Sequence, residues 1–116
     1  MIRRSDERKI DLREQVRGGD GVTIQQNVLN DEAELNGKGR TYAHIKLEPG
    51  CSMGFHEHHG ETECYYILKG TAEYNDNGEM KTLCEGDVSF TDDGEGHGIK
   101  NNGPGDLEFM ALILYK

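Results

Sequence analysis

Hydrophobic residues recur along this chain in short runs rather than at helical spacing. From Val22 onward, runs rich in β-formers alternate with clusters of Gly, Asn and Asp, a pattern typical of an antiparallel sandwich or barrel. The predicted strands cover residues 22–29, 40–47, 64–68, 70–74, 80–83, 87–90, 98–100 and 107–115. Only residues 11–17 are predicted to form a short helix, which Gly18 and Gly19 would end. The pattern therefore predicts a small all-β fold, an antiparallel β-barrel or jelly roll, with a short N-terminal extension.

Two strand-level features sharpen this prediction. Asp76, Asn77 and Gly78 tolerate positive φ and separate two β-rich runs, which indicates a hairpin. The last strand, residues 107–115, is apolar on both faces, so its outer face needs a cover. We expect a second copy of the chain, in a homodimer, to supply that cover; the alternative is the helix predicted over residues 11–17.

Composition and charge narrow the function classes. The 116 residues are 34% hydrophobic, enough for one domain over residues 1–116, and 13 basic against 22 acidic residues give a net charge of -9. This charge disfavours nucleic acid as a partner. The longest apolar run is residues 110–115, so no membrane span is expected, and the charged first nine residues lack a secretory pattern. A cytoplasmic location with three reduced cysteines, Cys51, Cys64 and Cys84, is the resulting expectation.

Candidate chemistry concentrates in the histidines. On a strand, His56 and His58 present their imidazoles to the same side. Glu63 follows after a short connection, and His97 comes from a separate Gly-rich turn. Three imidazoles and one carboxylate suit a divalent ion of Mn, Fe, Co, Ni, Cu or Zn. An octahedral centre with these ligands would leave two positions open, as in a working site. We therefore predict one metal ion per chain.

These residues stand at spacings that resemble the two motifs of the cupin superfamily. The positions that match the first motif are Gly50, His56, His58, Glu63 and Gly70, and those that match the second are Gly86, Gly94, His97 and Asn101. Asp92 departs from the pattern, since the second motif usually has proline there, which affects loop stiffness and leaves the ligand set intact. The resemblance covers residues 50–101. It implies a double-stranded β-helix and the four metal ligands named above.

Residues around this cluster divide into packing and candidate catalytic roles. Tyr65 shares strand parity with Glu63 and is expected to point inward, chiefly to pack, while Cys64 faces the other way as a buried, inert thiol. His59 reads as a solvated loop residue. The polar face that carries His44 either lines the pocket or meets solvent. Candidate general bases are Tyr65, His44 and Glu61.

The sequence supports two classes of function and, more weakly, a third. The first is a metal-dependent enzyme acting on a small oxygen-rich molecule such as a carboxylate, hydroxy ketone or sugar; the cupin resemblance implies a dioxygenase, decarboxylase or isomerase. The second is a non-catalytic module that binds or senses a small ligand through the same metal. The third is a purely structural barrel with an empty or zinc-filled site.

Overall fold

The computed structural model describes all residues 1–116 as ten β-strands and two single-turn 3-10 segments. The 3-10 segments are η1 (Ser5–Glu7) and η2 (Val16–Gly18). The strands are β1 (Ile10–Glu14), β2 (Val22–Leu29), β3 (Gly39–Leu47), β4 (Ser52–Glu57), β5 (Glu61–Lys69), β6 (Ala72–Asp76), β7 (Glu79–Leu83), β8 (Val88–Thr91), β9 (Gly96–Lys100) and β10 (Leu107–Tyr115). No helix has the length and hydrophobicity needed to span a bilayer.

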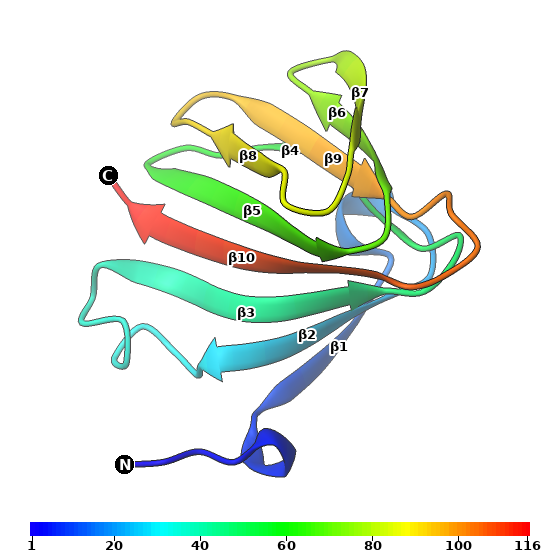
Figure 1. Cartoon of the computed structure of the whole chain (residues 1–116). Coiled ribbons are helices and arrows are strands. Elements are labelled where there is room, and N and C mark those ends of the chain that lie inside the picture. The colour runs from blue at the N-terminus through cyan, green and yellow to red at the C-terminus, as the bar shows by residue number, and fades with distance from the viewer.

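The strands form two antiparallel sheets, so the all-β prediction is confirmed. The larger sheet has the order β1-β2-β3-β10-β5-β8, and the smaller has the order β4-β9-β6-β7. In Figure 1 the larger sheet runs from β8 in the upper part of the picture to β1 at the bottom, and the β6–β7 hairpin of the smaller sheet stands above β8. Strands distant in sequence, such as β3 and β10, are neighbours, which closes the sandwich around one core.

The core lies between the two sheets and follows from strand alternation. On β3, Ala43, Ile45 and Leu47 are buried, while the residues between them are only half-buried. Cross-strand partners lie on the same face of a sheet. Phe109 on β10 pairs with Ile45 on β3, and it is fully buried. Met53, Tyr74 and Ile99 close the core from the smaller sheet and belong to the same hydrophobic cluster.

The hairpin predicted at residues 76–78 is confirmed. Strands β6 and β7 pair in antiparallel register, with Asp76 opposite Glu79. Asn77 and Gly78 form the two-residue loop, both at positive φ, 53° and 94°. Two consecutive residues at positive φ match the hand of turn that follows the twist of a hairpin.

The helix predicted over residues 11–17 is wrong. Ile10–Glu14 form strand β1, which pairs with β2 along its whole length, and only one 3-10 turn, η2, follows it. Helical spacing over so few residues is a weak preference, and five residues of ladder pairing with β2 outweigh it. Strand β1 lies at the sheet edge, separated from β10 by β2 and β3, so the N-terminal segment does not cover the last strand.

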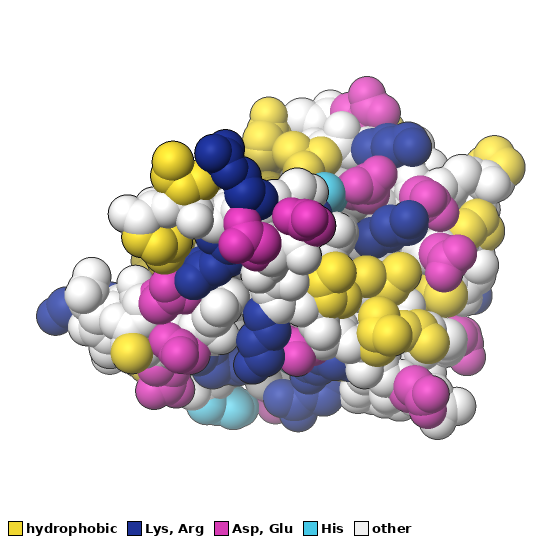
Figure 2. All heavy atoms as spheres, turned by 90° about the horizontal axis from the view of Figure 1, so that it is seen from below, with side chains coloured by type: hydrophobic (Ala, Val, Ile, Leu, Met, Phe, Trp, Pro, Cys, Tyr) yellow, Lys and Arg dark blue, Asp and Glu magenta, His cyan; other side chains and the backbone are white.

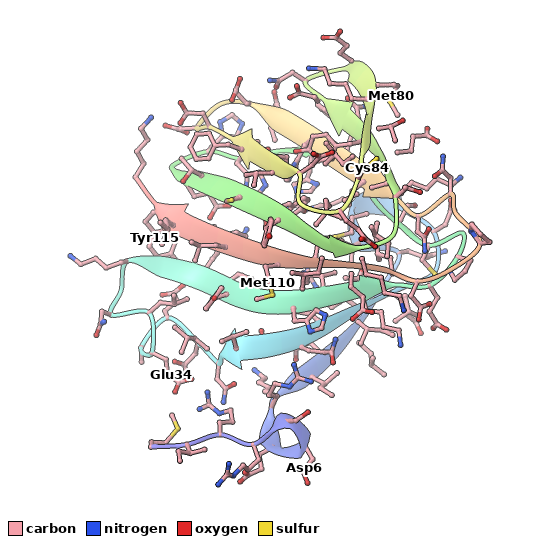
Figure 3. The ribbon with its side chains drawn as sticks, in the orientation of Figure 1. Asp6, Glu34, Met80, Cys84, Met110 and Tyr115 are labelled. Atoms are coloured by element: carbon pink, nitrogen blue, oxygen red, sulfur yellow. The ribbon has the colours of Figure 1, made fainter.

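The outer face of the larger sheet is apolar where β8, β5 and β10 adjoin. Its exposed large hydrophobic residues on these strands are Tyr66, Leu68, Val88, Phe90 and Leu114. Figure 3 shows Met110 on the near face of the same sheet, between β10 and β3. Seen from below, where β1 and β2 lie, acidic and basic side chains intermix around a group of hydrophobic ones (Figure 2). We call the apolar region on β8, β5 and β10 the outer apolar face.

Candidate metal centre

Three strands bring the four predicted ligands together. His56 lies near the end of β4 and His58 just after it, while Glu63 lies near the start of β5. His97 lies on β9 directly opposite His56, because β4 and β9 pair at these two residues. The strand β4 was absent from the strand predictions, but the expectation that His56 and His58 face one point is met by their ring centroids, 4.9 Å apart.

The ligand atoms of the four residues converge tightly. One atom from each of His56, His58, Glu63 and His97 lies within 4.8 Å of all the others. Glu63 Oε1 is 3.0 Å from His58 Nε2 and 2.9 Å from His97 Nε2. The two Nε2 atoms are 3.1 Å apart. The chemical groups therefore surround one small volume between the sheets.

The other ring nitrogen of each histidine has its own partner. His56 Nδ1 donates to the Gly54 carbonyl at 2.8 Å, and His58 Nδ1 donates to Glu61 Oε1 at 2.9 Å. His97 Nδ1 lies 2.8 Å from the Tyr74 hydroxyl and 2.9 Å from Thr91 Oγ1. Because a carbonyl and a carboxylate accept hydrogen bonds from Nδ1–H, the Nε2 atoms of His56 and His58 carry lone pairs aimed at the shared volume when these imidazoles are neutral.

This arrangement fits a cation. Imidazole lone pairs that meet a carboxylate oxygen at about 3 Å repel one another unless a positive charge lies between them. A mixed nitrogen and oxygen set of this kind is the ligand type that divalent transition metals take in proteins. The residues present therefore suit one divalent ion, whose identity they do not specify.

Burial and hydrogen bonding shift the pKa values of the clustered residues. Glu63 and His97 are almost completely buried, and His56 is half-buried. Burial opposes ionisation of Glu63, but protonated Nε2 atoms of His58 and His97, whose protons a bound metal ion would displace, donate hydrogen bonds that outweigh it and lower the pKa of this carboxyl to about 2. Burial lowers the pKa of His56, whereas the hydrogen bond to Glu63 raises that of His58. Near neutral pH, Glu63 is thus an anion ready to bind a cation.

Tyr65 lies against the cluster as a packing residue. Its ring stacks on His97 with centroids 4.8 Å apart and contacts Phe109 at 4.6 Å. Its hydroxyl is directed at the Met53 sulfur, 4.0 Å away. Burial, with Glu63 next in effect, raises the pKa of Tyr65 well above its usual value, so the hydroxyl keeps its proton.

The remaining sequence candidates lie around or outside the centre. His44 is on the outer face of β3, where Nε2 is 2.8 Å from Glu108 Oε1. His59 is exposed, beside Glu57. Glu61 holds His58 and also accepts two hydrogen bonds from Arg40, at 2.7 and 2.8 Å.

Asn101, in the turn before β10, and the three cysteines are the last residues to place. Asn101 is buried and its Nδ2 donates to the carbonyls of Leu47 and Gly105, so it holds the turn before β10. Cys64 faces away from the centre, but it is only half-buried, because its partner across the ladder is the exposed Phe90. All three cysteines are free, as predicted.

The centre opens into a cavity of about 50 Å³. Its lining includes His56, His58, Glu63 and Tyr65, and three arginines that the sequence reasoning did not single out: Arg13, Arg17 and Arg40. The alternation of Ile10 and Leu12 with Asp11 and Arg13 is a sequence signal for a strand, but it favours the apolar residues and not Arg13 on the inner face. A cavity of this volume admits a ligand of only a few non-hydrogen atoms.

Comparison with known proteins assigns the family. A family model described as Cupin domain matches residues 43–113, which include all four clustered residues. The chain belongs to the cupin family. This cupin is 45% identical to an oxalate-binding protein of Thermotoga maritima over 114 residues, covering 98% of this chain and 93% of the relative.

Solved cupin structures extend the likeness. A crystal structure from Thermotoga maritima described as a predicted oxalate decarboxylase superposes with a TM-score of 0.93 at 42% identity, with both chains covered completely. An uncharacterised Klebsiella pneumoniae protein with a double-stranded β-helix domain superposes with a TM-score of 0.70 at 26% identity, covering 86% of this cupin and 83% of that chain. The cupin fold expected from the two motifs is therefore confirmed.

Proposed function

We propose that this cupin binds one divalent metal ion through His56, His58, Glu63 and His97 and uses it to bind a small dicarboxylate of the oxalate type. The observation that carries the proposal is the convergence of three imidazoles and one carboxylate at the end of a small cavity. When bound, the ion supplies a positive charge that polarises a carboxylate or carbonyl oxygen. The names of the Thermotoga maritima relatives support oxalate as the first ligand to test.

The chain's own residues supply orientation and a partly dry environment. Glu61, Tyr74 and Thr91 fix the imidazoles of His58 and His97 through their Nδ1 atoms. Met53 and Ile45 line the cavity with apolar surface and limit the water around a bound ligand. With a ligand present, we propose metal-dependent enzyme chemistry on it, as a dioxygenase, decarboxylase or isomerase.

A second candidate function is binding without turnover, and one observation favours it. Of the three sequence candidates for a general base, His44 lies outside the cavity and Glu61 is committed to Arg40 and His58. Tyr65 stays protonated, since burial raises its pKa well above the usual value. With no free base beside the metal ligands, binding or sensing of the acid needs no further residue.

Metal analysis and calorimetry test the proposal together. We expect protein purified without chelator to hold close to one metal ion per chain and to bind oxalate, and both to be lost on chelation. His58→Ala is expected to lose the metal, whereas the matched control His59→Ala, an exposed neighbour bound only to Glu57, is expected to keep it.

Turnover is measured on the same samples by following oxalate consumption with and without O₂. Consumption by the wild type and not by His58→Ala supports the enzyme, and binding without consumption supports the sensing module. A folded wild-type protein that takes up no divalent metal contradicts both.

Two partner and location predictions accompany this proposal. We propose a homodimer joined through the outer apolar face, supported by the exposed hydrophobic residues on β5 and β8. The cytoplasmic location and the organisation as one domain over residues 1–116 stay predictions.

A further inference from the structure

Two arginines of the metal cavity have no acidic partner. Arg40 forms a bidentate ion pair with Glu61, so its charge is compensated. Arg13 donates only to the neutral side chain of Gln25, at 3.1 Å, and Arg17 has no side-chain hydrogen bond or ion pair. In a chain with a net charge of -9, uncompensated cations beside a cavity attract an anionic ligand that the rest of the surface repels.

The register of β1 directs Arg13 inward. Arg13 pairs with Thr23, which is buried and pairs in turn with the fully buried Leu47. Ile10 and Leu12 alternate with Arg13 and are exposed on the opposite face. Strand β1 thus turns Ile10 and Leu12 to the outer face and places Arg13, which is itself exposed, on the side that lines the cavity.

Arg13 stands where the metal cavity meets a larger groove. A second cavity of about 540 Å³ runs along β1, β2 and β3. The residues that line both cavities are Arg13, Gln25, Arg40 and Thr41. Arg13 therefore lies between the centre and the open groove.

We propose that Arg13 is a specificity-determining residue that binds the outer carboxylate of a dicarboxylate whose inner carboxylate is held at the metal centre. This inference rests on the proposed function. A divalent ion with Glu63 as its single anionic ligand leaves one positive charge, and the uncompensated Arg13 and Arg17 add further positive charge, which favours a dianion over a monoanion. A guanidinium also matches a carboxylate with two parallel hydrogen bonds.

The same geometry accounts for selection against a monocarboxylate of similar size. Glycolate carries a hydroxyl where oxalate carries its second carboxylate, so it satisfies the metal charge but leaves Arg13 with a neutral partner. Arg13 should therefore contribute to oxalate affinity and contribute little to glycolate affinity.

The test compares oxalate and glycolate by titration calorimetry on Mn²⁺-loaded protein whose metal content has been measured. Arg13→Gln removes the charge, Arg13→Lys keeps it, and Arg8→Gln is the matched control. Arg8 also donates to a glutamine, Gln26, at 3.1 Å, but lines neither cavity. We expect Arg13→Gln to weaken oxalate binding about tenfold, as for loss of a charge-assisted hydrogen bond, with glycolate affinity unchanged.

Each outcome of this test decides the inference. Partial rescue by Arg13→Lys, with Arg8→Gln equal to wild type, supports it. Equal affinities of wild type and Arg13→Gln for oxalate overturn it, and so does an equal loss for both ligands; in either case metal-dependent acid binding by the wild type still stands. If the metal-loaded wild type binds neither ligand, the proposed function fails and the inference fails with it. Metal content and melting temperature, measured on every variant, separate these results from misfolding.

Discussion

At the scale of single residues, the candidate centre depends on groups that do not touch the ligand volume. Each clustered histidine has its Nδ1 atom fixed by a different element: Gly54 on β4, Glu61 on β5, and Tyr74 and Thr91 on β6 and β8. Such partners set the tautomer and the orientation of a ligating imidazole. Their removal should therefore weaken the site while the four clustered residues remain in place.

Glu61 provides the sharpest case of this dependence. Glu61→Ala removes the acceptor for His58 Nδ1 and leaves Arg40 without its bidentate partner. We expect metal affinity to fall about 10- to 100-fold, the usual effect of losing such a partner, measured by competition with a chelator of known affinity. Glu57→Ala is the control, since Glu57 is exposed and contacts only His59. Equal affinity of the two variants would contradict the role of Glu61.

The ion pair between Glu61 and Arg40 should also make the stability of the fold depend on pH. Hydrogen bonding from Arg40, opposed by burial and aided by His58, lowers its pKa from 4.5 to about 2. A carboxyl with a depressed pKa in the folded state stabilises the fold above its unfolded pKa, and this contribution is lost as the pH falls toward the folded value. In metal-free protein, the stability difference between wild type and Glu61→Gln should shrink from about pH 5 to about pH 2. Urea unfolding measures it, and a difference independent of pH argues against the ion pair.

The residues that sequence reasoning found and missed differ in how local their signal is. His56, His58 and Glu63 lie within eight positions, so strand parity and a recognisable spacing suffice to group them. Arg13 reaches the same cavity from a strand at the start of the chain, and nothing in its neighbourhood indicates which distant residues it will face. Contacts set by sheet order rather than by spacing are beyond a reading of the sequence alone.

At the scale of elements, β4 is held close to the N-terminal segment by two glycines. A Cβ on Gly54 would lie 2.1 Å from the Arg17 carbonyl oxygen, and one on Gly19 would lie 2.3 Å from the Ser52 carbonyl oxygen. Only residues without a side chain allow backbones to approach this closely. The contact joins η2 to the strand that carries His56, and so joins the arginine side of the cavity to the metal side.

Gly54→Ala tests this contact between η2 and β4. Because the added methyl group meets backbone rather than a flexible side chain, we expect a loss of about 1–3 kcal/mol in the free energy of unfolding, measured by urea denaturation. Metal affinity should fall too, since the Gly54 carbonyl accepts from His56 Nδ1. Gly105→Ala is the control, because a Cβ there meets nothing within 4 Å. Equal stability of both variants would show that η2 moves away freely.

The N-terminal segment also shows where element prediction fails. Residues 11–17 contain good helix formers, and their apolar residues are too few to distinguish a helix from an edge strand. Pairing of Ile10–Glu14 with β2 decides the outcome, a contact between different parts of the chain. By contrast, the bounds of β2 and β10 were predicted correctly, because each is a long run of β-formers between turn residues.

At the scale of the whole molecule, polar groups are buried at one end while an apolar face is exposed, the opposite of the usual distribution. The interior of one end holds a buried carboxylate and two buried imidazoles, with the exposed Arg13 lining the cavity beside them, while the outer face of β5, β8 and β10 is apolar. A continuous exposed apolar region of this kind marks an interaction surface in soluble proteins. Since β1 lies at the other edge of the sheet, no segment of the same chain covers it. A second copy of the chain, meeting the same face through a two-fold axis, would bury it.

Met110 and Met80 provide matched probes of that dimer, and Figure 3 shows them on different parts of the molecule, β10 and the β6–β7 hairpin. Met110→Glu places a charge on the outer apolar face, whereas Met80→Glu places the same charge on β7 of the other sheet. We expect wild type and Met80→Glu to scatter light with twice the 13.0 kDa chain mass at micromolar concentration, and Met110→Glu to dissociate, because burying an unpaired charge disfavours association. A wild-type mass of one chain contradicts the dimer, and a dimer that tolerates Met110→Glu and not Met80→Glu moves the interface to the smaller sheet.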